Sequence, residues 1–220
     1  MKIVPEVPNE DGLVRRMISG DEEAFTHLYR RLHPPIFRFA LHMSGNSGIA
    51  EDVTQEVFMT LIRNAKEFDA SRGTLSAFLF GVARNQVRKR WERDRRLVSI
   101  EEEREDEKSG KARETLYENM SADVTAYRNG SGNAANLSGF DRFASQETVA
   151  RVRGAVSSLP ENYREVVILC ELEEMSYEEA AEALDCPVGT VRSRLHRARA
   201  ILLEKLREPE TARRASAVGE

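Results

Sequence analysis

The residues best suited to chemistry lie near the C-terminal end, where arginines alternate with small polar side chains. From Val188 onward, helical spacing places an apolar stripe on one side and Gly, Thr, Ser, His and Arg on the other. Arginine can pair with guanine through two hydrogen bonds, and serine or threonine can bond to a base or a phosphate. This pattern predicts contact with double-stranded DNA through five residues: Thr190, Arg192, Ser193, His196 and Arg197.

The segment just before these arginines predicts how they are positioned. Ser176 and Glu179 match a capping box, which starts a short helix whose apolar residues recur at helical spacing. A turn at 185–187 ends it, and Pro187 suits the first turn of the helix that follows. Two helices joined by a tight turn, with an Arg-rich second helix, predict a helix-turn-helix with its recognition helix. An ordinary helical hairpin with a solvated arginine face is the alternative.

A second candidate interface lies on the helix expected from residue 75 to 91. Its predicted core stripe consists of Leu75, Phe78, Leu79, Val82 and Gln86. Another face carries Phe80, Val87 and Trp91 beside Arg84 and Arg88. Aromatic rings offer stacking surfaces worth about 1 to 3 kcal/mol per unpaired base, and arginine neutralises phosphates. The pattern therefore suits single-stranded nucleic acid, although exposed aromatic residues also pack on neighbouring helices.

Residues 47–68 predict another amphipathic helix, upstream of this one. Its expected buried stripe consists of Val53, Val57, Leu61, Ala65 and Phe68. The opposite side carries Asp52, Gln55, Glu56, Met59 and Arg63. A turn is expected at 69–73, after which Thr74 can cap the next helix. Nearer the N-terminus, Asp21 is a predicted N-cap, and Pro34 with Pro35 is expected to break or kink the helix that it starts.

Charge is distributed unevenly along the chain. There are 33 Lys and Arg against 37 Asp and Glu, a formal net charge of −4. Residues 84–96 hold seven basic residues against two acids, and residues 186–207 hold six against one, a local charge of +5 in each. Residues 161–185 hold nine acids against Arg164 alone, a local charge of −8. Basic islands attract phosphate backbones, and acidic surroundings weaken indiscriminate binding. Solvated helix faces are the ordinary alternative.

The apolar pattern predicts an all-α chain of two small helical domains. Apolar residues recur at helical spacing from Leu13 to Trp91 and from Val149 to Leu206, without the sustained alternation typical of strands. The stretch between them is acidic and then rich in Gly, Ser and Asn, which is the composition of a flexible linker. The 220 residues thus divide into a helical domain (1–96), a flexible acidic linker (97–145), a second helical domain (146–207) and a C-terminal tail (208–220).

Composition argues against several other classes of protein. No stretch approaches the roughly 20 apolar residues of a membrane span, and the N-terminus lacks the apolar core of a secretory signal, so we expect a cytoplasmic protein. Cys170, Cys186 and the four histidines show no ligand spacing, which predicts no disulfide framework, metal or cofactor. Carboxylates are abundant, but none is paired with a histidine or a Gly-rich phosphate loop. We therefore expect a protein that is not an enzyme.

Four stretches resemble the extracytoplasmic-function (ECF) group of bacterial sigma-70 factors. Residues 176–181 (SYEEAA) and 185–199 (DCPVGTVRSRLHRAR) are similar to region 4.2 of that family, which binds the promoter −35 element. Residues 50–58 (AEDVTQEVF) resemble region 2.2, which docks on the β′ clamp helices of RNA polymerase, and residues 78–85 (FLFGVARN) resemble region 2.3. The resemblance covers both predicted domains in the family's order and separation.

The resemblance implies a sigma factor, with sigma region 2 and sigma region 4 as its two helical domains. It implies −35 contact through the five recognition-helix residues given above. Contact with core polymerase, whose partner surfaces are the β′ clamp helices and the β flap, is implied for Asp52, Gln55, Glu56 and Met59. Capture of the unpaired −10 strand is implied for Phe68, Arg72, Phe80, Arg84, Asn85 and Arg88. Gly81 lies where many relatives carry a longer polar residue. An anti-sigma partner is implied by the family alone.

Two other functions remain open from the residues themselves. A stand-alone helix-turn-helix regulator would use its first domain for dimerisation or ligand sensing, and would bind its operator unaided. A helical protein-interaction adaptor would not depend on DNA at all. A sigma factor, by contrast, is expected to bind promoter DNA weakly until core polymerase is added.

Overall fold

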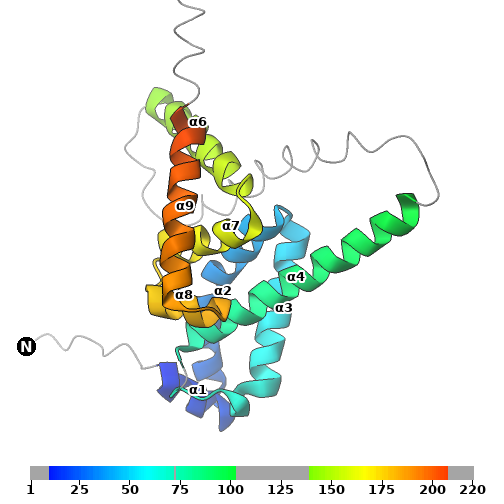
Figure 1. The fold of residues 1–220 in the computed structure, drawn as a ribbon. Coiled ribbons are helices and arrows are strands. Elements are labelled where there is room, and N and C mark those ends of the chain that lie inside the picture. Colours follow the sequence, from blue (N-terminus) through cyan, green and yellow to red (C-terminus); the bar gives the residue numbers. More distant parts are fainter. Residues whose placement is uncertain (1–9, 72, 103–138, 208–220) are drawn as a thin grey trace, which may run out of the picture.

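The computed structural model describes residues 10–71, 73–102 and 139–207, and the regular structure in these ranges is entirely helical. The predicted all-α class is therefore confirmed. The helices form two groups, one on each side of residues 103–138 in the sequence, and the groups pack against each other (Figure 1).

The first group consists of α1 (Glu10–Ile18), α2 (Glu22–Ser44), α3 (Ser47–Asn64), the 3-10 turn η1 (Ala65–Glu67) and α4 (Leu75–Glu102). α2 is its central element, because α1, α3 and α4 all pack against it. Leu28, Ile36 and Phe39 of α2 are fully buried. Burial of side chains of this size contributes about 1.5 to 3 kcal/mol each, so this core holds α3 and α4 in fixed positions.

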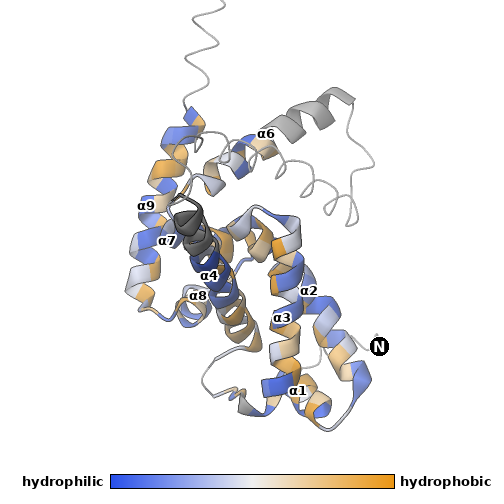
Figure 2. Cartoon of the chain, turned by 90° about the vertical axis from the view of Figure 1, so that its right-hand side faces the viewer, coloured by the Kyte–Doolittle hydropathy of each residue, from blue (hydrophilic) through white to orange (hydrophobic). Residues whose placement is uncertain are grey.

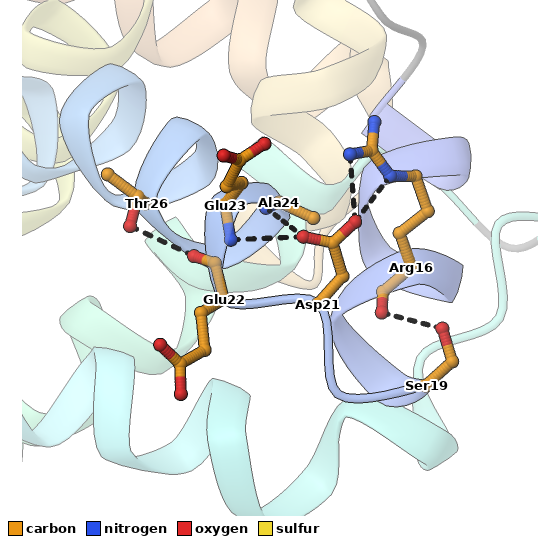
Figure 3. Close-up of polar contacts among 7 residues, drawn as sticks. All are labelled: Arg16, Ser19, Asp21, Glu22, Glu23, Ala24 and Thr26. Carbon is orange, nitrogen blue, oxygen red and sulfur yellow. Dashed lines mark hydrogen bonds and ion pairs between the residues drawn. The ribbon is translucent and has the colours of Figure 1, made fainter.

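Local hydrogen bonds start α2 at the residue expected from the sequence. The Asp21 carboxylate accepts bonds from the backbone N–H groups of Glu23 and Ala24 at 3.0 and 3.1 Å (Figure 3). Its other oxygen accepts from Arg16 Nε at 2.8 Å. These contacts, above all the bond from Ala24, lower the pKa of Asp21. The charged carboxylate is thereby favoured at the positive end of the helix dipole.

α2 is not interrupted at Pro34 and Pro35, since the helix runs from Glu22 to Ser44. A break at this point, one of the two outcomes expected, does not occur. Leu32 and Ile36, on either side of the prolines, are both buried in the core. Tertiary packing thus holds the helix together where two backbone N–H donors are missing.

The second group consists of α6 (Gly139–Ser157), α7 (Glu161–Val167), the π-helical turn η2 (Ile168–Leu172), α8 (Tyr177–Leu184) and α9 (Val188–Arg207). α9 packs against α6, α7 and α8. The apolar stripe expected for α9 is buried at Val191, Leu195 and Ala198. One side of α9 is therefore fixed against its group, and the other is left to solvent.

The two groups meet along α4 and α2. α8 packs against α4, while α6, α7 and η2 contact α2. Figure 2 shows that α4 changes along its length from hydrophobic to hydrophilic residues. Helix extends into both ends of the predicted linker, since α4 reaches Glu102 and α6 begins at Gly139. The flexibility of that segment stays a prediction, and the predicted tail at 208–220 lies outside the described residues.

Candidate nucleic-acid interface

α8 and α9 form the helix-turn-helix expected from the sequence. Ser176 Oγ accepts a hydrogen bond from the Glu179 N–H at 3.1 Å, and Glu179 Oε2 accepts one from the Ser176 N–H at 3.0 Å. The capping box is therefore complete. Asp185 ends α8 in the left-handed conformation, with φ at 49°. The Pro187 carbonyl then accepts the Thr190 N–H at 2.8 Å, which starts α9.

The outward side of α9 carries the residues predicted to contact duplex DNA. Four of these side chains are exposed and the fifth is half-buried: Arg192, Ser193, His196 and Arg197, then Thr190. Arg197 has no ion-pair partner among the described residues, whereas Arg199 pairs with Glu171 at 2.5 Å. The Arg192 guanidinium lies 5.8 Å from the centroid of the Tyr177 ring, so α8 helps to orient it. This surface is cationic and open to solvent.

A second candidate surface surrounds a cavity of about 450 Å³ beside α4. Phe68, Phe78, Arg84 and Asn85 line it from the first group of helices. The Phe68 and Phe78 rings lie 5.9 Å apart, centroid to centroid. Aromatic rings, a guanidinium and an amide are the groups that hold unpaired bases in nucleic-acid complexes. The structure thus brings together Phe68, Arg84 and Asn85, three of the residues predicted to contact the −10 strand.

The other three predicted −10 residues are placed differently. Arg88 is exposed one helical turn beyond Arg84. Arg72 lies outside the described residues. Phe80 is only 4% exposed and packs edge-on against Phe39, with ring centroids 5.5 Å apart. The prediction that Phe80 shares an exposed face with the arginines is therefore wrong.

The core stripe predicted for α4 is also partly wrong. Leu75 and Leu79 are fully buried as expected, but Phe78 is 36% exposed and Val87 is fully buried. The physical reason is that α4 is covered by α2 and α3 and also by α8, so a single stripe does not describe its burial. Phe78, which was assigned to the core, is instead a lining residue of the cavity.

Two arginines of α4, Arg84 and Arg88, pair with acids of the second group. Arg84 Nε donates to Glu165 Oε1 at 2.7 Å, and the Glu165 side chain is almost fully buried. Burial raises the pKa of Glu165, and the bond from Arg84 opposes that shift. Arg88 pairs with Glu161 at 3.4 Å. Sequence reasoning missed these acids as site residues, and the signal that could have found them is the local charge of −8 at 161–185.

The residues predicted to contact core polymerase lie on the outward side of α3. Asp52, Gln55 and Met59 are exposed, and Glu56 is half-buried. The expected stripe on the opposite side is buried at Val53, Val57, Leu61 and Ala65. The predicted amphipathic pattern is therefore confirmed over α3 and η1, and its polar side is accessible to a partner. Phe68, the last residue of the expected stripe, lies beyond η1, is half-buried and lines the cavity.

Two exposed hydrophobic side chains near the outward side of α3 are not predicted as site residues by the sequence. Ile62 on α3 is 53% exposed, and Tyr29 on α2 is 40% exposed. The Tyr29 ring lies 4.7 Å from that of Phe58, centroid to centroid. Apolar and aromatic side chains within a polar rim are typical of protein–protein contact surfaces. Phe58 is buried in the core, so its contact with Tyr29 joins this patch to the core.

Three other features would indicate a different kind of site in the described residues: a membrane span, a metal site and a reactive thiol. None of their helices is long and apolar enough to cross a membrane. They also contain no group of three or more His, Cys, Asp or Glu side chains that could hold a metal ion. Cys170 and Cys186 are free thiols, and burial raises the pKa of Cys170 to about 11. A protonated thiol is a poor nucleophile.

Comparison with known proteins identifies the family. A model of Sigma-70 region 2 matches residues 28–97, and a model of Sigma-70 region 4 matches residues 150–202. The ECF RNA polymerase sigma-E factor of Escherichia coli (strain K12) is 33% identical over 201 residues, covering 88% of this chain and 92% of the relative. The chain belongs to the ECF sigma factors. The ECF RNA polymerase sigma factor SigW of Bacillus subtilis (strain 168) is 28% identical over 195 residues, covering 89% of this sigma factor and 95% of the relative.

Solved structures of other proteins share the fold of this sigma factor. The sigma factor RpoE, in complex with the anti-sigma factor NepR from Bartonella quintana, aligns with a TM-score of 0.59 at 23% identity, over 84% of this chain and 98% of that one. CnrH, in complex with the cytosolic domain of CnrY, aligns with a TM-score of 0.58 at 24% identity, over 88% and 94%. The sigma factor acts in transcription initiation with RNA polymerase, and its family is not one of enzymes.

Proposed function

We propose that this sigma factor brings core RNA polymerase to promoters by reading duplex −35 DNA with α9 and holding the unpaired −10 strand at α4. The observation that carries the proposal is the outward side of α9, which is exposed and Arg-rich opposite a buried apolar stripe. It lies within the segment that matches region 4. The second helix of a helix-turn-helix inserts its N-terminal residues into the major groove.

Each of the five α9 residues predicted to contact DNA has a role in this proposal. Arg192 and Arg197 present guanidinium groups, which suit guanine edges or phosphates. Thr190, Ser193 and His196 supply shorter hydrogen-bonding groups at the same end of the helix. Contacts to phosphate set the register of the helix on the duplex, and contacts to base edges carry the sequence preference.

The α4 side of the cavity, together with Phe68, is the proposed site of the −10 strand. Phe68 and Asn85 would receive a base, and Arg84, Arg88 and Arg72 would contact the strand backbone. Phe78 takes the aromatic role expected of Phe80, because its ring is partly exposed beside Phe68. Each broken DNA stack costs about 1.4 kcal/mol on average, and one base on an aromatic surface regains about 1 to 3 kcal/mol. Capture of a few bases can therefore offset local melting without ATP.

Protein partners are proposed for both groups of helices. Core polymerase, through its β′ clamp helices, would bind the outward side of α3 at Asp52, Gln55, Glu56 and Met59. The exposed apolar residues Ile62 and Tyr29 would extend that contact. The β flap would bind the second group. An anti-sigma factor is a further partner, which the complex of RpoE with NepR supports by similarity of fold.

Run-off transcription with purified core polymerase tests the proposal. The chain is expected to direct core polymerase to a small set of promoters from the source genome that core polymerase alone does not use. A mobility-shift assay on the same fragments should show weak binding by the chain alone and strong binding by the holoenzyme. Failure to initiate on any promoter of that genome would contradict the proposal. Tight promoter binding by the chain alone would indicate a stand-alone regulator instead.

A further inference from the structure

Two ion pairs with a buried carboxylate join the first group of helices to the second. Arg84 on α4 pairs with Glu165 on α7 at 2.7 Å, and their side chains are 16% and 2% exposed. Arg38 on α2 makes two bonds to Glu173, from Nε to Oε1 at 3.0 Å and from Nη2 to Oε2 at 2.5 Å. The Glu173 side chain is 3% exposed. In both pairs the cation belongs to the first group and the buried carboxylate to the second.

These pairs specify one docking of the two groups. A carboxylate that leaves water loses much hydration energy, which only a well-placed partner restores. Burial raises the pKa of Glu165 and of Glu173 even though an arginine opposes the shift in each case. A docking that kept these carboxylates buried but moved the arginines away would leave them without a cation. The partners lie 81 and 135 residues apart in the sequence, so the pairs report the closure of the whole chain.

The backbones also approach closely beside the cavity. A Cβ on Gly81 would lie 3.3 Å from the carbonyl oxygen of Ala183, and a Cβ on Gly73 would collide with the Glu182 carboxylate. Glu182, Ala183 and Asp185 of the second group form one wall of the cavity. Two carboxylates on this wall disfavour the approach of phosphate. The arrangement that closes the chain therefore also blocks the proposed site of the −10 strand.

The charge pattern of the sequence has the same polarity as these contacts. Residues 161–185, with a local charge of −8, supply the acids of these ion pairs, and Glu182 and Asp185 of the cavity wall. Residues 84–96, with a local charge of +5, begin at Arg84 and include Arg88. Arg88 pairs with Glu161 at 3.4 Å at the exposed edge of the junction. Charge segregation along the chain thus becomes attraction between its two halves.

We propose that the acidic segment 161–185 is an internal competitor for the −10 strand. In the free chain its carboxylates occupy Arg84 and Arg88 while α8 forms one wall of the cavity, so the two groups of helices must part before the strand can lie along α4. The inference rests on the proposed role of α4 in −10 binding. Only the open fraction of the chains is competent to bind, and the apparent affinity for single-stranded DNA falls by that fraction.

The test uses the full, free chain and removes one carboxylate charge at a time, as Glu165→Gln, as Glu173→Gln and as the double variant. Small-angle X-ray scattering gives the radius of gyration. Fluorescence anisotropy gives the affinity for a labelled single-stranded oligonucleotide with the −10 sequence of a promoter found by run-off transcription. The double variant is expected to expand and to bind the oligonucleotide about tenfold more tightly. Glu171→Gln is the matched control, because Glu171 pairs within the second group, with Arg199.

A charge swap keeps the test decisive if one glutamine variant folds poorly. Glu173→Arg places two cations together at the junction and is expected to open the chain. Adding Arg38→Glu restores an ion pair of reversed polarity, which is expected to restore the wild-type radius of gyration and the weak oligonucleotide binding. Circular dichroism melting curves show whether each variant is folded.

Two results would overturn the inference. One is an unchanged radius of gyration in both the double glutamine variant and Glu173→Arg. The other is expansion without a gain in oligonucleotide affinity, because closure would then not cover the strand-binding surface. The scattering result needs no DNA, and run-off transcription by the wild-type chain needs no variant. Failure of the internal competition is therefore distinguishable from failure of the proposed function.

Discussion

Arg197→Ala measures what one exposed arginine contributes to promoter recognition. Arg197 has no ion-pair partner among the described residues and its side chain is exposed on α9, so truncation removes no contact that holds the fold. We expect the free energy of unfolding to change by less than about 0.5 kcal/mol. A bidentate contact to a base is worth about 1 to 3 kcal/mol, so the affinity of the holoenzyme for its promoter should fall about 5- to 150-fold.

Arg199→Ala is the matched control for this variant. It removes the same kind of side chain from the same helix, but Arg199 is engaged with Glu171 and lies outside the residues predicted to read bases. An exposed ion pair of this kind contributes about 0 to 1 kcal/mol to stability. The control should therefore keep the wild-type order of preference among promoter sequences, even if its loss of charge weakens binding to all of them equally.

The assay is fluorescence anisotropy with holoenzyme on promoter duplexes that each differ at a single −35 position, repeated at several salt concentrations. Arg197→Ala should reduce the affinity for the preferred promoter and remove the discrimination at one position. If the ranking of the duplexes is unchanged in this variant, Arg197 does not read a base. The assignment of base recognition to this side of α9 would then be refuted at that position.

Three further predictions concern stability. Burial, together with the charges of Arg153 and Arg38, lowers the pKa of His42 from 6.5 to about 4. Between these pH values only the unfolded chain gains a proton at this residue. The free energy of unfolding should therefore be unaffected by His42 above pH 6.5 and fall by up to about 3 kcal/mol toward pH 4. Urea unfolding across that range should show a smaller loss in His42→Gln. Leu195→Ala, at a side chain that is 1% exposed, should cost about 2 to 5 kcal/mol in thermal unfolding. Ser176→Ala, which removes the cap of α8, should cost about 1 kcal/mol.

Each of these predictions has a result that contradicts it. Equal acid sensitivity in wild type and His42→Gln would mean that the native state takes up the proton at His42. A cost well below about 2 kcal/mol for Leu195→Ala would mean that the site collapses around the missing atoms. Exposed Ser193 is the control for Ser176, and equal melting of Ser176→Ala and Ser193→Ala would show that the capping box contributes nothing measurable.

Features that depend on a few neighbouring residues could be predicted from the sequence. The caps at Asp21 and Ser176 act over two or three residues, and both are present. Thr74 likewise accepts the Ala77 N–H at 3.1 Å, as expected for the start of α4. The stripes of α3 and α9 were also predictable, because each of these helices presents a continuous outward side. The orientation of the candidate DNA and polymerase residues on them follows, and their roles stay predictions.

Burial on α4 could not be predicted in the same way. Its periodicity shows which residues share a side, but not how many sides are covered. α8 lies about a hundred residues later in the chain and packs against α4, and its residues share the cavity that Phe78 lines. Phe80 is buried on another side of α4, against Phe39 of α2. The partners of Arg84 and Arg38 were hidden for the same reason. Sequence shows an excess of acid at 161–185, whereas only the fold shows which two carboxylates are buried against which arginines.

Arg84 connects the closed chain to the proposed function because carboxylate and phosphate are alternative ligands of one guanidinium. Arginine binds both through charge-assisted hydrogen bonds of similar geometry. Exchange of Glu165 for a phosphate therefore changes the energy of that single contact little. What opposes the exchange is the docking of α8 on α4 and the pair between Arg38 and Glu173, neither of which DNA replaces. In the proposed function core polymerase binds the two groups of helices at separate surfaces, and that binding can supply the free energy that parts them.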